Sequence, residues 1–299
     1  MATTPRLSLP RVSDRIGILV FEHARIRRAG NTITAQTSDG TYTVPIATLT
    51  AILAGPGTSI THDAATLIAD CGVTVCWTGS GGIRAYSTIT PLAVSADLLH
   101  HHIHAWADPD QRLAAAYRAY RLRFDDDTAG LNIVELRALE GRRMKTAYQQ
   151  AADRYGITWT RRVAQWEDAD PVNRAITAAY HGLYGAAANV IAALGCHPSL
   201  GFIHTGKRDA FVYDLADIYK PTIGLDIAFS HAADLIPEKA IRTALNQTLR
   251  ENHLLALMVR HLYTIVGVTE PDAEVIYLDD LSLYDPDLGQ VPARKNWAH

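Results

Sequence analysis

Residues 171–194 read PVNRAITAAYHGLYGAAANVIAAL, a long stretch with the apolar pattern of an α-helix. The same helical period begins at about residue 95 and continues until about Gly267. This part of the chain is therefore predicted to be helical. The other helices expected in it are Ala96–Ala105, Pro109–Phe124, Asn132–Tyr155, Asp209–Lys220 and Pro237–Val266.

Up to about residue 90 the pattern consists of short runs rich in Ile, Val, Thr and aromatic residues, separated by glycine turns. One helix, Asp63–Asp70 with Thr61 as its N-cap, is expected among the strands. The expected strands are Ile16–Phe21, Thr32–Gln36, Tyr42–Ile46, Val73–Trp77 and Ile83–Ser87.

These two patterns predict an α+β protein. We expect a small, β-sandwich-like N-terminal domain over residues 1–92 and a larger all-α C-terminal domain over residues 93–269. An acidic tail over residues 270–299 follows them.

The composition is that of a folded globular protein, with 299 residues, 48% of them hydrophobic and 20% charged. No apolar run approaches the roughly 18 residues that a membrane helix needs, and the start lacks a hydrophobic secretion segment. We therefore expect a cytoplasmic protein with no membrane partner. The cysteines Cys71, Cys76 and Cys196 are too few and too scattered for a disulfide framework or a thiolate zinc site, and are expected to be buried thiols.

The formal net charge of -3 does not exclude a nucleic-acid partner, because the acidic residues are concentrated near the C-terminus. Residues 270–287 hold seven Asp or Glu and no Lys or Arg. The chain before residue 270 carries 26 basic and 24 acidic residues. Since phosphate binding depends on clustered Lys and Arg, local basic faces remain possible.

Glu140 lies in an otherwise apolar stripe of the predicted helix Asn132–Tyr155, one turn from Leu136 and from Met144. A carboxylate on that face points inward, and a buried isolated charge costs several kcal/mol. Glu140 therefore needs an arginine, a proton or a metal ion. A structural pair with Arg137 or Arg143 is an open alternative to a metal site.

Three further polar residues follow in the stretch 201–221. His204 lies on a glycine-flanked loop, and Asp214 and Asp217 are three residues apart on the next predicted helix. Two like charges on one helix face repel each other, and a bound cation removes that cost. A solvated acidic face and a buried structural histidine are the simpler alternatives. Histidine with carboxylates is the ligand set that suits Mg²⁺ or Mn²⁺, and such sites most often act on phosphates.

Other motifs indicate less. His100, His101, His102 and His104 form the densest histidine cluster, but no glutamate accompanies them in zinc-protease order, so a surface or interface helix is favoured. Gly79–Gly82 lies between two predicted strands and is interpreted as a hairpin turn. Gly206 and Lys207 lack the upstream glycine of a phosphate-binding loop.

The sequence resembles the CRISPR-associated adaptation integrase, the larger subunit of the complex that inserts new spacers into CRISPR arrays, and looks most like its type I-E branch. The likeness covers about residues 10–267. It is carried by Leu136–Gly141, by Asp170–Gly185, by Gly201–Lys207 and by Tyr213–Asp217.

The resemblance implies a site for Mg²⁺ or Mn²⁺ formed by Glu140, His204 and Asp217, with Asp214 close by and also catalytic. The implied reaction is a transesterification, in which a 3′-hydroxyl of incoming double-stranded DNA attacks a phosphodiester at the edge of a CRISPR repeat. Related endonuclease cleavage would use the same site.

Family members form dimers through the β domain, and two such dimers flank a central dimer of a small ferredoxin-like subunit. The resemblance therefore implies a homodimer within a heterohexamer. Five residues are expected near DNA, where Arg and Lys hold phosphates and the tyrosine wedges or stacks at a strand end: Arg84, Arg137, Tyr184, Lys207 and Arg242.

Two departures from the family pattern affect the expected DNA contacts. The loop 160–165 is shorter than in the type I-E branch, and His23 and Ser59 stand where a tyrosine and an arginine are expected. Two other functions remain open. One is a stand-alone divalent-metal nuclease for branched DNA, and the other is a non-catalytic DNA-binding scaffold.

Overall fold

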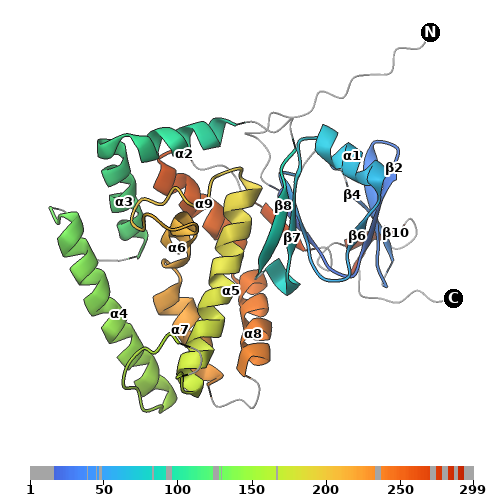
Figure 1. Cartoon of the computed structure of the whole chain (residues 1–299). Coiled ribbons are helices and arrows are strands. Elements are labelled where there is room, and N and C mark those ends of the chain that lie inside the picture. The colour runs from blue at the N-terminus through green and yellow to red at the C-terminus, as the bar shows by residue number, and fades with distance from the viewer. Residues whose placement is uncertain are drawn as a thin grey trace, which may run out of the picture. The chain divides into compact units, whose positions relative to one another are not determined.

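The computed structural model describes the backbone of residues 17–38, 40–44, 46, 49–82, 84–91, 96–123, 128, 130–165, 168–232, 237–269, 274–277, 282–285 and 289–292. The chain divides into two compact units. Unit 1 comprises residues 1–77, 86–96 and 271–299, and unit 2 comprises residues 78–85 and 97–270. Figure 1 shows strands in the first and helices in the second. This is the predicted α+β arrangement, with a β region followed by a helical region.

The larger sheet of the β region has five strands in the order β8-β7-β5-β1-β9. Its parallel pairs are β1 with β5, β5 with β7 and β1 with β9. Strands β5 and β7 are almost entirely buried, as is usual for parallel strands. The strands are β1 (Gly17–Phe21), β5 (Ala51–Ala54), β7 (Thr74–Thr78), β8 (Ala85–Ile89) and β9 (Glu274–Tyr277).

The second sheet has four strands in the order β4-β3-β2-β6. Its bounds are β2 (Arg25–Ala29), β3 (Thr32–Gln36), β4 (Thr41–Val44) and β6 (Ser59–Ile60). One hydrophobic core joins the two sheets and the helix α1 (His62–Asp70), with Phe21, Ile26, Ile33, Ile52 and Ile68 among its members. As predicted, Thr61 caps this helix, and its side chain accepts a hydrogen bond from the Ala64 N–H.

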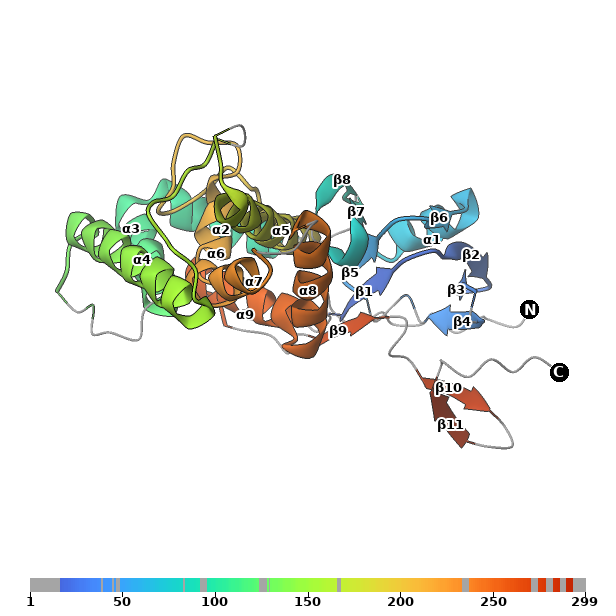
Figure 2. The same cartoon turned by 90° about the horizontal axis from the view of Figure 1, so that it is seen from below.

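Unit 2 is built around the helix α5 (Pro171–Ala193), which packs against α6, α7, α8 and α9. Figure 2 shows the same helices from below. Asp170 caps the start of α5, and fifteen residues of this helix are buried. The other helices are α2 (Asp97–Ala107), α3 (Pro109–Arg123), α4 (Ile133–Tyr155), α6 (Ala210–Ala216), α7 (Leu225–Ser230), α8 (Pro237–Glu251) and α9 (Leu254–Val266).

Two predicted helices differ from the observed ones. The helix expected over 209–220 ends at Ala216, and a π-helical turn follows over Lys220–Gly224. Pro221 has no N–H to continue the α-helical hydrogen bonds, and it restricts the residue before it. The helix expected over 237–266 divides after Glu251, because His253 adopts a left-handed conformation with φ 47°.

The cysteines lie as expected. Cys76 and Cys196 are buried and Cys71 is partly buried, and no disulfide joins them. Burial raises the pKa of Cys76 to about 11 and that of Cys196 to about 12, so neither is a reactive thiolate at neutral pH. Within the part of the chain that the structure describes, no helix is long and apolar enough to span a membrane.

The region after residue 270 contributes strands to the fold. β9 adds to the edge of the five-stranded sheet, where Ile18 pairs with Val275 and Leu19 with Ile276. Strands β10 (Ser282–Asp285) and β11 (Gly289–Pro292) form an antiparallel pair. The acidic residues Glu270, Asp272, Asp279, Asp280 and Asp287 lie outside the described residues, so the charge of this tail stays a sequence observation.

Candidate metal and nucleic-acid site

The loop before α6 is held by one carboxylate. Asp214 is fully buried on α6, and its Oδ2 accepts hydrogen bonds from the N–H groups of Phe202 (2.6 Å) and Ile203 (3.0 Å). Its Oδ1 accepts from the His204 N–H at 3.0 Å and lies 2.8 Å from Nδ1 of the His204 ring. These contacts satisfy a charge that would otherwise be costly to bury.

The Asp214 contact fixes the orientation of the His204 ring. A carboxylate only accepts hydrogen bonds, so Nδ1 of the neutral ring carries the proton and Nε2 keeps its lone pair. Nε2 lies 3.8 Å from Oδ2 of Asp217, and the His204 side chain is 33% exposed. A histidine that binds a metal through one ring nitrogen usually donates a hydrogen bond from the other nitrogen to a carboxylate, as Nδ1 of His204 does to Asp214.

Neighbouring residues restrict this loop at two points, Gly201 and the Leu200 carbonyl. A Cβ on Gly201 would collide with the carbonyl oxygen of His204 and the backbone of Ala210, so only glycine fits there. The ring of the fully buried His102, on α2, contacts the carbonyl oxygen of Leu200 through Nε2 at 2.9 Å. The loop therefore packs between α2 and α6.

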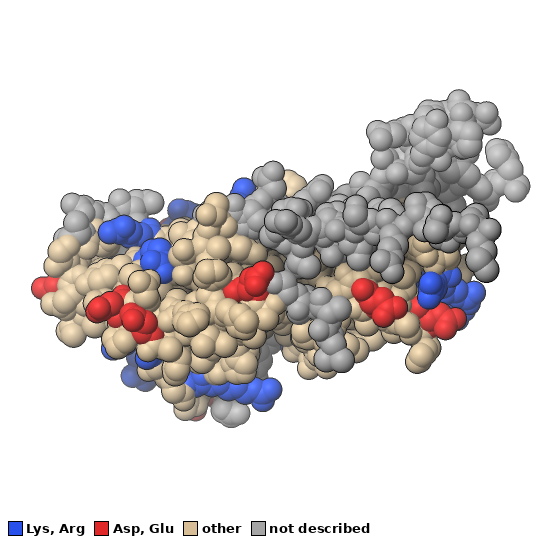
Figure 3. Space-filling view, turned by 90° about the horizontal axis from the view of Figure 1, so that it is seen from above, with Lys and Arg blue, Asp and Glu red and all other residues tan. Residues whose placement is uncertain are grey.

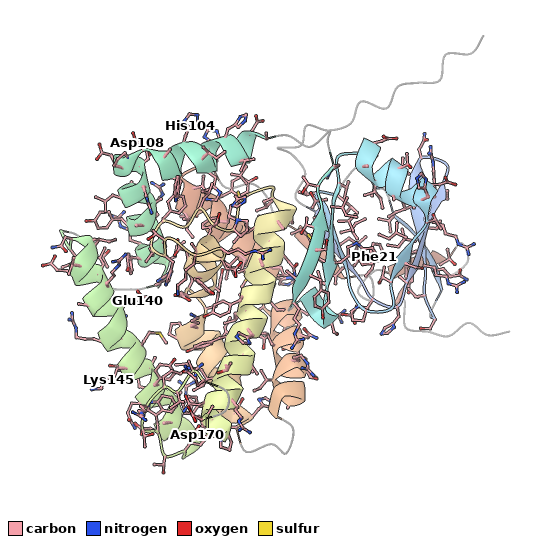
Figure 4. All side chains as sticks on the ribbon, viewed as in Figure 1. Phe21, His104, Asp108, Glu140, Lys145 and Asp170 are labelled. Atoms are coloured by element: carbon pink, nitrogen blue, oxygen red, sulfur yellow. The ribbon has the colours of Figure 1, made fainter. Side chains whose placement is uncertain are left out.

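Glu140 lies on α4, on the side that faces the other helices of unit 2 (Figure 4). Its Oε1 is 2.5 Å from Nη1 of Arg123, the last residue of α3, and the Tyr120 hydroxyl lies 3.5 Å from its Oε2. The helix α4 begins with a capping box, in which Asn132 and Glu135 satisfy each other's backbone N–H groups. A structural pair with Arg137 or Arg143 was the open alternative for Glu140, and the arginine that the structure pairs with it is Arg123.

Asp217 is the C-cap of α6 and lies near two cations and the His204 ring. Its Oδ1 forms an ion pair with Lys220, and its Oδ2 lies 4.0 Å from Nη1 of Arg123 and 3.8 Å from Nε2 of His204. Glu140 and Asp217 thus approach the same guanidinium nitrogen, although they come from helices far apart in the sequence. Figure 4 shows the side chains that gather between these helices.

Burial and these charges shift the pKa values of the neighbouring side chains. Burial alone would lower the pKa of Arg123, but Asp217, Glu140 and Asp214 outweigh it and raise that pKa, so the guanidinium is permanently charged. Burial and the Glu140 carboxylate raise the pKa of Tyr120 to about 12. Burial and Asp217 raise the pKa of Tyr184. Both tyrosines are therefore neutral hydrogen-bond donors at neutral pH.

The donor types fit a hard divalent cation, since two carboxylates and an imidazole nitrogen converge on one region. As arranged, however, the described residues contain no group of three or more His, Cys, Asp or Glu placed to hold a metal ion. The Arg123 guanidinium supplies positive charge between Glu140 and Asp217 instead. Metal binding by Glu140, His204 and Asp217 thus stays a prediction.

The predicted DNA-binding residues all lie in unit 2. Around the carboxylates, Arg137 donates to the Ile203 carbonyl, and Lys207 lies over the ring of Tyr213 at 5.5 Å. Tyr184 packs edge-on against Tyr213, with Nζ of Lys220 4.7 Å from its ring centre. Arg84 and Arg242 are exposed. Arg84 follows the segment Ser80–Gly82 and its charge contributes to the lowered pKa of His181, whose ring centre lies 6.2 Å from that of Tyr184, and Arg242 lies on α8. Charged side chains of both signs are interspersed on the face drawn in Figure 3.

Arg123 and Lys220 are site residues that the sequence did not predict. A signal for Arg123 exists, because it continues the buried stripe of Ala116, Ala119 and Tyr120 at helical spacing. The argument that singled out Glu140 applies equally to an arginine in such a stripe. No comparable signal marks Lys220, which precedes a proline in a turn.

The motifs given less weight also have defined places. His100, His101 and His104 are exposed on α2, as expected for a surface helix, whereas His102 is fully buried. The expected turn at Gly79–Gly82 is a short 3₁₀ segment over Ser80–Gly82, and its Gly82 carbonyl accepts a hydrogen bond from Asn189 of α5 at 2.5 Å.

The fold and site define a class, namely α+β proteins in which a β region precedes a helical region containing acidic residues and a histidine. Comparison with known proteins is more specific. The sequence model of the family described as CRISPR associated protein Cas1 matches residues 18–128 and 126–255. The chain belongs to this family.

Individual relatives match over most of their length. The chain is 34% identical over 299 residues to a Clostridium sp. protein named CRISPR-associated endonuclease Cas1, covering 97% of this chain and 99% of the relative. It is 38% identical to CRISPR-associated endonuclease Cas1 2 of Thermus thermophilus, covering 89% and 84%. A crystal structure of a TtCas1–DNA complex superposes with a TM-score of 0.80 at 38% identity, covering 87% of this chain and 99% of that one.

Proposed function

We propose that this protein is a metal-dependent DNA integrase and endonuclease that inserts spacer DNA into a CRISPR array. The observation that carries the proposal is the convergence of Glu140, His204 and Asp217 on one charged region of a Cas1-family chain. A relative of the same fold has been solved with DNA, which supports a DNA substrate.

In this proposal Glu140, His204 and Asp217 hold Mg²⁺ or Mn²⁺. When bound, the ion would neutralise developing charge on the phosphate and lower the pKa of the attacking hydroxyl. The other residues prepare the site. Asp214 holds the Nδ1 side of the His204 ring and leaves Nε2 for the ion, and the loop N–H groups hold the Asp214 carboxylate in position.

The proposed reaction exchanges one phosphodiester bond for another. The 3′-hydroxyl oxygen of the incoming strand bonds to a phosphorus at the repeat edge, and the bond from that phosphorus to the 3′ oxygen of the preceding nucleotide in the target strand breaks. The hydroxyl loses its proton, and the leaving oxygen gains one. Lys207 and Arg137, close to the carboxylates, would hold phosphate oxygens, and Tyr184 would stack at a strand end. Arg84 and Arg242, both exposed, would hold other phosphates of the DNA.

We further propose the assembly that the family resemblance implies. The protein would form a homodimer, and two such dimers would join a small ferredoxin-like adaptation subunit in a heterohexamer. We also propose that it belongs to the type I-E branch. The duplex substrates would be the prespacer and the CRISPR repeat. The shortened loop 160–165 and the His23 and Ser59 positions predict that DNA contacts differ in detail from other members of that branch.

The test combines the protein, its small partner subunit, a short DNA duplex, a repeat-containing plasmid and Mg²⁺. Integration is expected with the wild type, and Glu140→Gln and His204→Asn should each lower it at least a hundredfold because each removes a proposed ligand. Asp226→Asn is the matched control, since Asp226 forms an exposed ion pair with Arg154.

Other outcomes would replace the proposal. Full integration by folded Glu140→Gln and His204→Asn variants would refute the assigned site. Cleavage of branched DNA without the partner, and no integration, would favour a stand-alone nuclease. Tight DNA binding unaffected by chelator and no strand transfer would favour a non-catalytic scaffold.

A further inference from the structure

The Arg123 guanidinium lies among the carboxylates of the proposed metal site. Its side chain is 2% exposed, with Nη1 at 2.5 Å from Oε1 of Glu140 and at 4.0 Å from Oδ2 of Asp217. Nη2 donates to the carbonyl oxygen of Asp214 at 3.0 Å. One cation thus contacts all three acidic residues that the sequence singled out.

We propose that Arg123 is the resident counter-cation of this site, which holds Glu140 and Asp217 together without a divalent ion and weakens the binding of that ion when it enters. This inference rests on the proposed function, because it assigns the ion to Glu140, His204 and Asp217. Arg123 is a positioning residue in this role, and it contacts neither DNA nor a reacting atom.

The need for a counter-cation follows from the burial of the carboxylates. Like charges that are close together in a region of low dielectric repel each other strongly. Asp214 is compensated by three backbone N–H groups and by the His204 ring. Asp217 has Lys220 on its other oxygen. Among the described residues, Arg123 is the cation that the structure pairs with Glu140. The other contact of this carboxylate is with the neutral hydroxyl of Tyr120.

The competition follows from the place of the guanidinium. A divalent ion bound by Glu140 and Asp217 would share their carboxylate oxygens with Arg123. Two cations that contact the same carboxylates repel each other. Arg123 cannot swing freely away, because its Nη2 is bonded to the Asp214 carbonyl and its guanidinium lies 5.4 Å from the Tyr120 ring centre. The repulsion is therefore part of the cost of binding the ion.

The test measures Mn²⁺ affinity by the electron paramagnetic resonance signal of the free ion, on full-length protein without DNA. Arg123→Gln should bind Mn²⁺ at least tenfold more tightly than the wild type. Arg123→Lys keeps the charge and should stay within about threefold of the wild type. The control Arg154→Gln removes an arginine whose ion pair is exposed and should leave the affinity unchanged.

An Mn²⁺ affinity of Arg123→Gln that equals or falls below that of the wild type would overturn the inference. Thermal unfolding gives a second readout. Without metal, Arg123→Gln should melt several degrees below the wild type, and saturating Mn²⁺ should raise its melting temperature more than that of the wild type. Equal Mn²⁺-induced shifts would count against competition.

If Arg123→Gln does not fold, the wild type itself supplies the test. The ¹⁵N signals of the Arg123 guanidinium, assigned with Arg123→Lys, should shift as Mg²⁺ is added. Signals that stay fixed while Mg²⁺ saturates its site would overturn the inference.

Failure of the inference is distinguishable from failure of the proposed function. Glu140→Gln and His204→Asn should each weaken Mn²⁺ binding at least tenfold. If neither does, the proposed metal site is wrong and the inference falls with it. If both do and Arg123→Gln has no effect, only the role of Arg123 is wrong.

Discussion

Asp214 is the residue on which the geometry of the loop 202–204 depends. Replacing it with Asn would turn one acceptor oxygen into a donor facing N–H groups, wherever the amide points. We expect Asp214→Asn to lower the free energy of unfolding by about 2–4 kcal/mol, because buried donors lose their acceptor. Urea unfolding followed by circular dichroism measures this loss.

Asp226→Asn is the matched control for that experiment. Asp226 is 46% exposed and accepts from Arg154 and from the Tyr155 hydroxyl. Since exposed ion pairs contribute little, we expect a change of no more than about 1 kcal/mol. Equal losses in the two variants would show that the buried hydrogen bonds of Asp214 carry no special weight.

His102 should make the stability of the protein depend on pH. Burial lowers its pKa, with a smaller contribution in the same direction from His197, while the Leu200 carbonyl and Asp214 oppose the change. The unfolded chain therefore binds a proton at a higher pH than the folded one, and stability present above about pH 6.5 is lost as the pH falls below it.

The measurement compares urea unfolding at pH 7.5 and pH 5.5. His102→Gln should be less stable than the wild type at pH 7.5 because it loses ring packing against Phe202 and Phe211. It should, however, lose less stability than the wild type between the two pH values, because it lacks the group whose pKa folding lowers. His181, whose pKa burial also lowers, titrates in both proteins and cancels. Parallel pH profiles would refute the assignment to His102.

At this scale the sequence predicted the identity of the charged residues better than their partners. Glu140, His204 and Asp217 were expected to meet, and the structure brings them to one region. Asp214 was expected close to the metal ligands, which stays a prediction, and its hydrogen bonds to the backbone N–H groups of residues 202–204 were not foreseen. Arg123 was missed because a cation's partners come from other helices, and helical spacing gives only the face on which a residue lies.

At the scale of elements, the helix α4 places Glu140 and depends on its capping box. Asn132→Ala removes the acceptor for the Val134 and Glu135 N–H groups. We expect a loss of about 1 kcal/mol in unfolding free energy, measured by urea denaturation. Thr146→Ala on the same helix, at an exposed position, should change stability by no more than about 0.5 kcal/mol. Similar effects of both changes would contradict the role of the cap.

The strands that the sequence missed show the limits of pattern reading. β2 reads RIRRA, and only Ile26 among its five residues is buried, so its charged residues concealed the alternation. β5 reads AILA, and four buried residues give no alternation at all. The break between α8 and α9 at His253 has no glycine or proline to mark it. The long helices α4 and α5 were predicted to within one or two residues, because many turns repeat the same pattern.

At the scale of the whole molecule, the pairing of β9 with β1 gives the C-terminal region a structural role. Deleting residues 270–299 would expose the edge of β1. A strand edge that is paired in the full-length protein promotes association with other chains once it is exposed. We expect a lower melting temperature and aggregates larger than any formed by the full-length protein, measured by light scattering.

A deletion of residues 278–299 is the matched control, because it keeps β9 and removes the rest of the tail. It should behave as the full-length protein does in both measurements. If the longer deletion also remains unaggregated with an unchanged melting temperature, β9 contributes nothing to the stability of the sheet.

The same pairing has a consequence for synthesis on the ribosome. β1 is translated before the helices of unit 2, and its partner β9 follows them, about 250 residues after β1. The helices can pack on one another while the sheet still lacks β9, since contacts between residues close in the sequence form faster than contacts between distant ones. During that interval a nascent chain has an open sheet edge, and a chaperone that shields β1 would protect it until β9 has been translated.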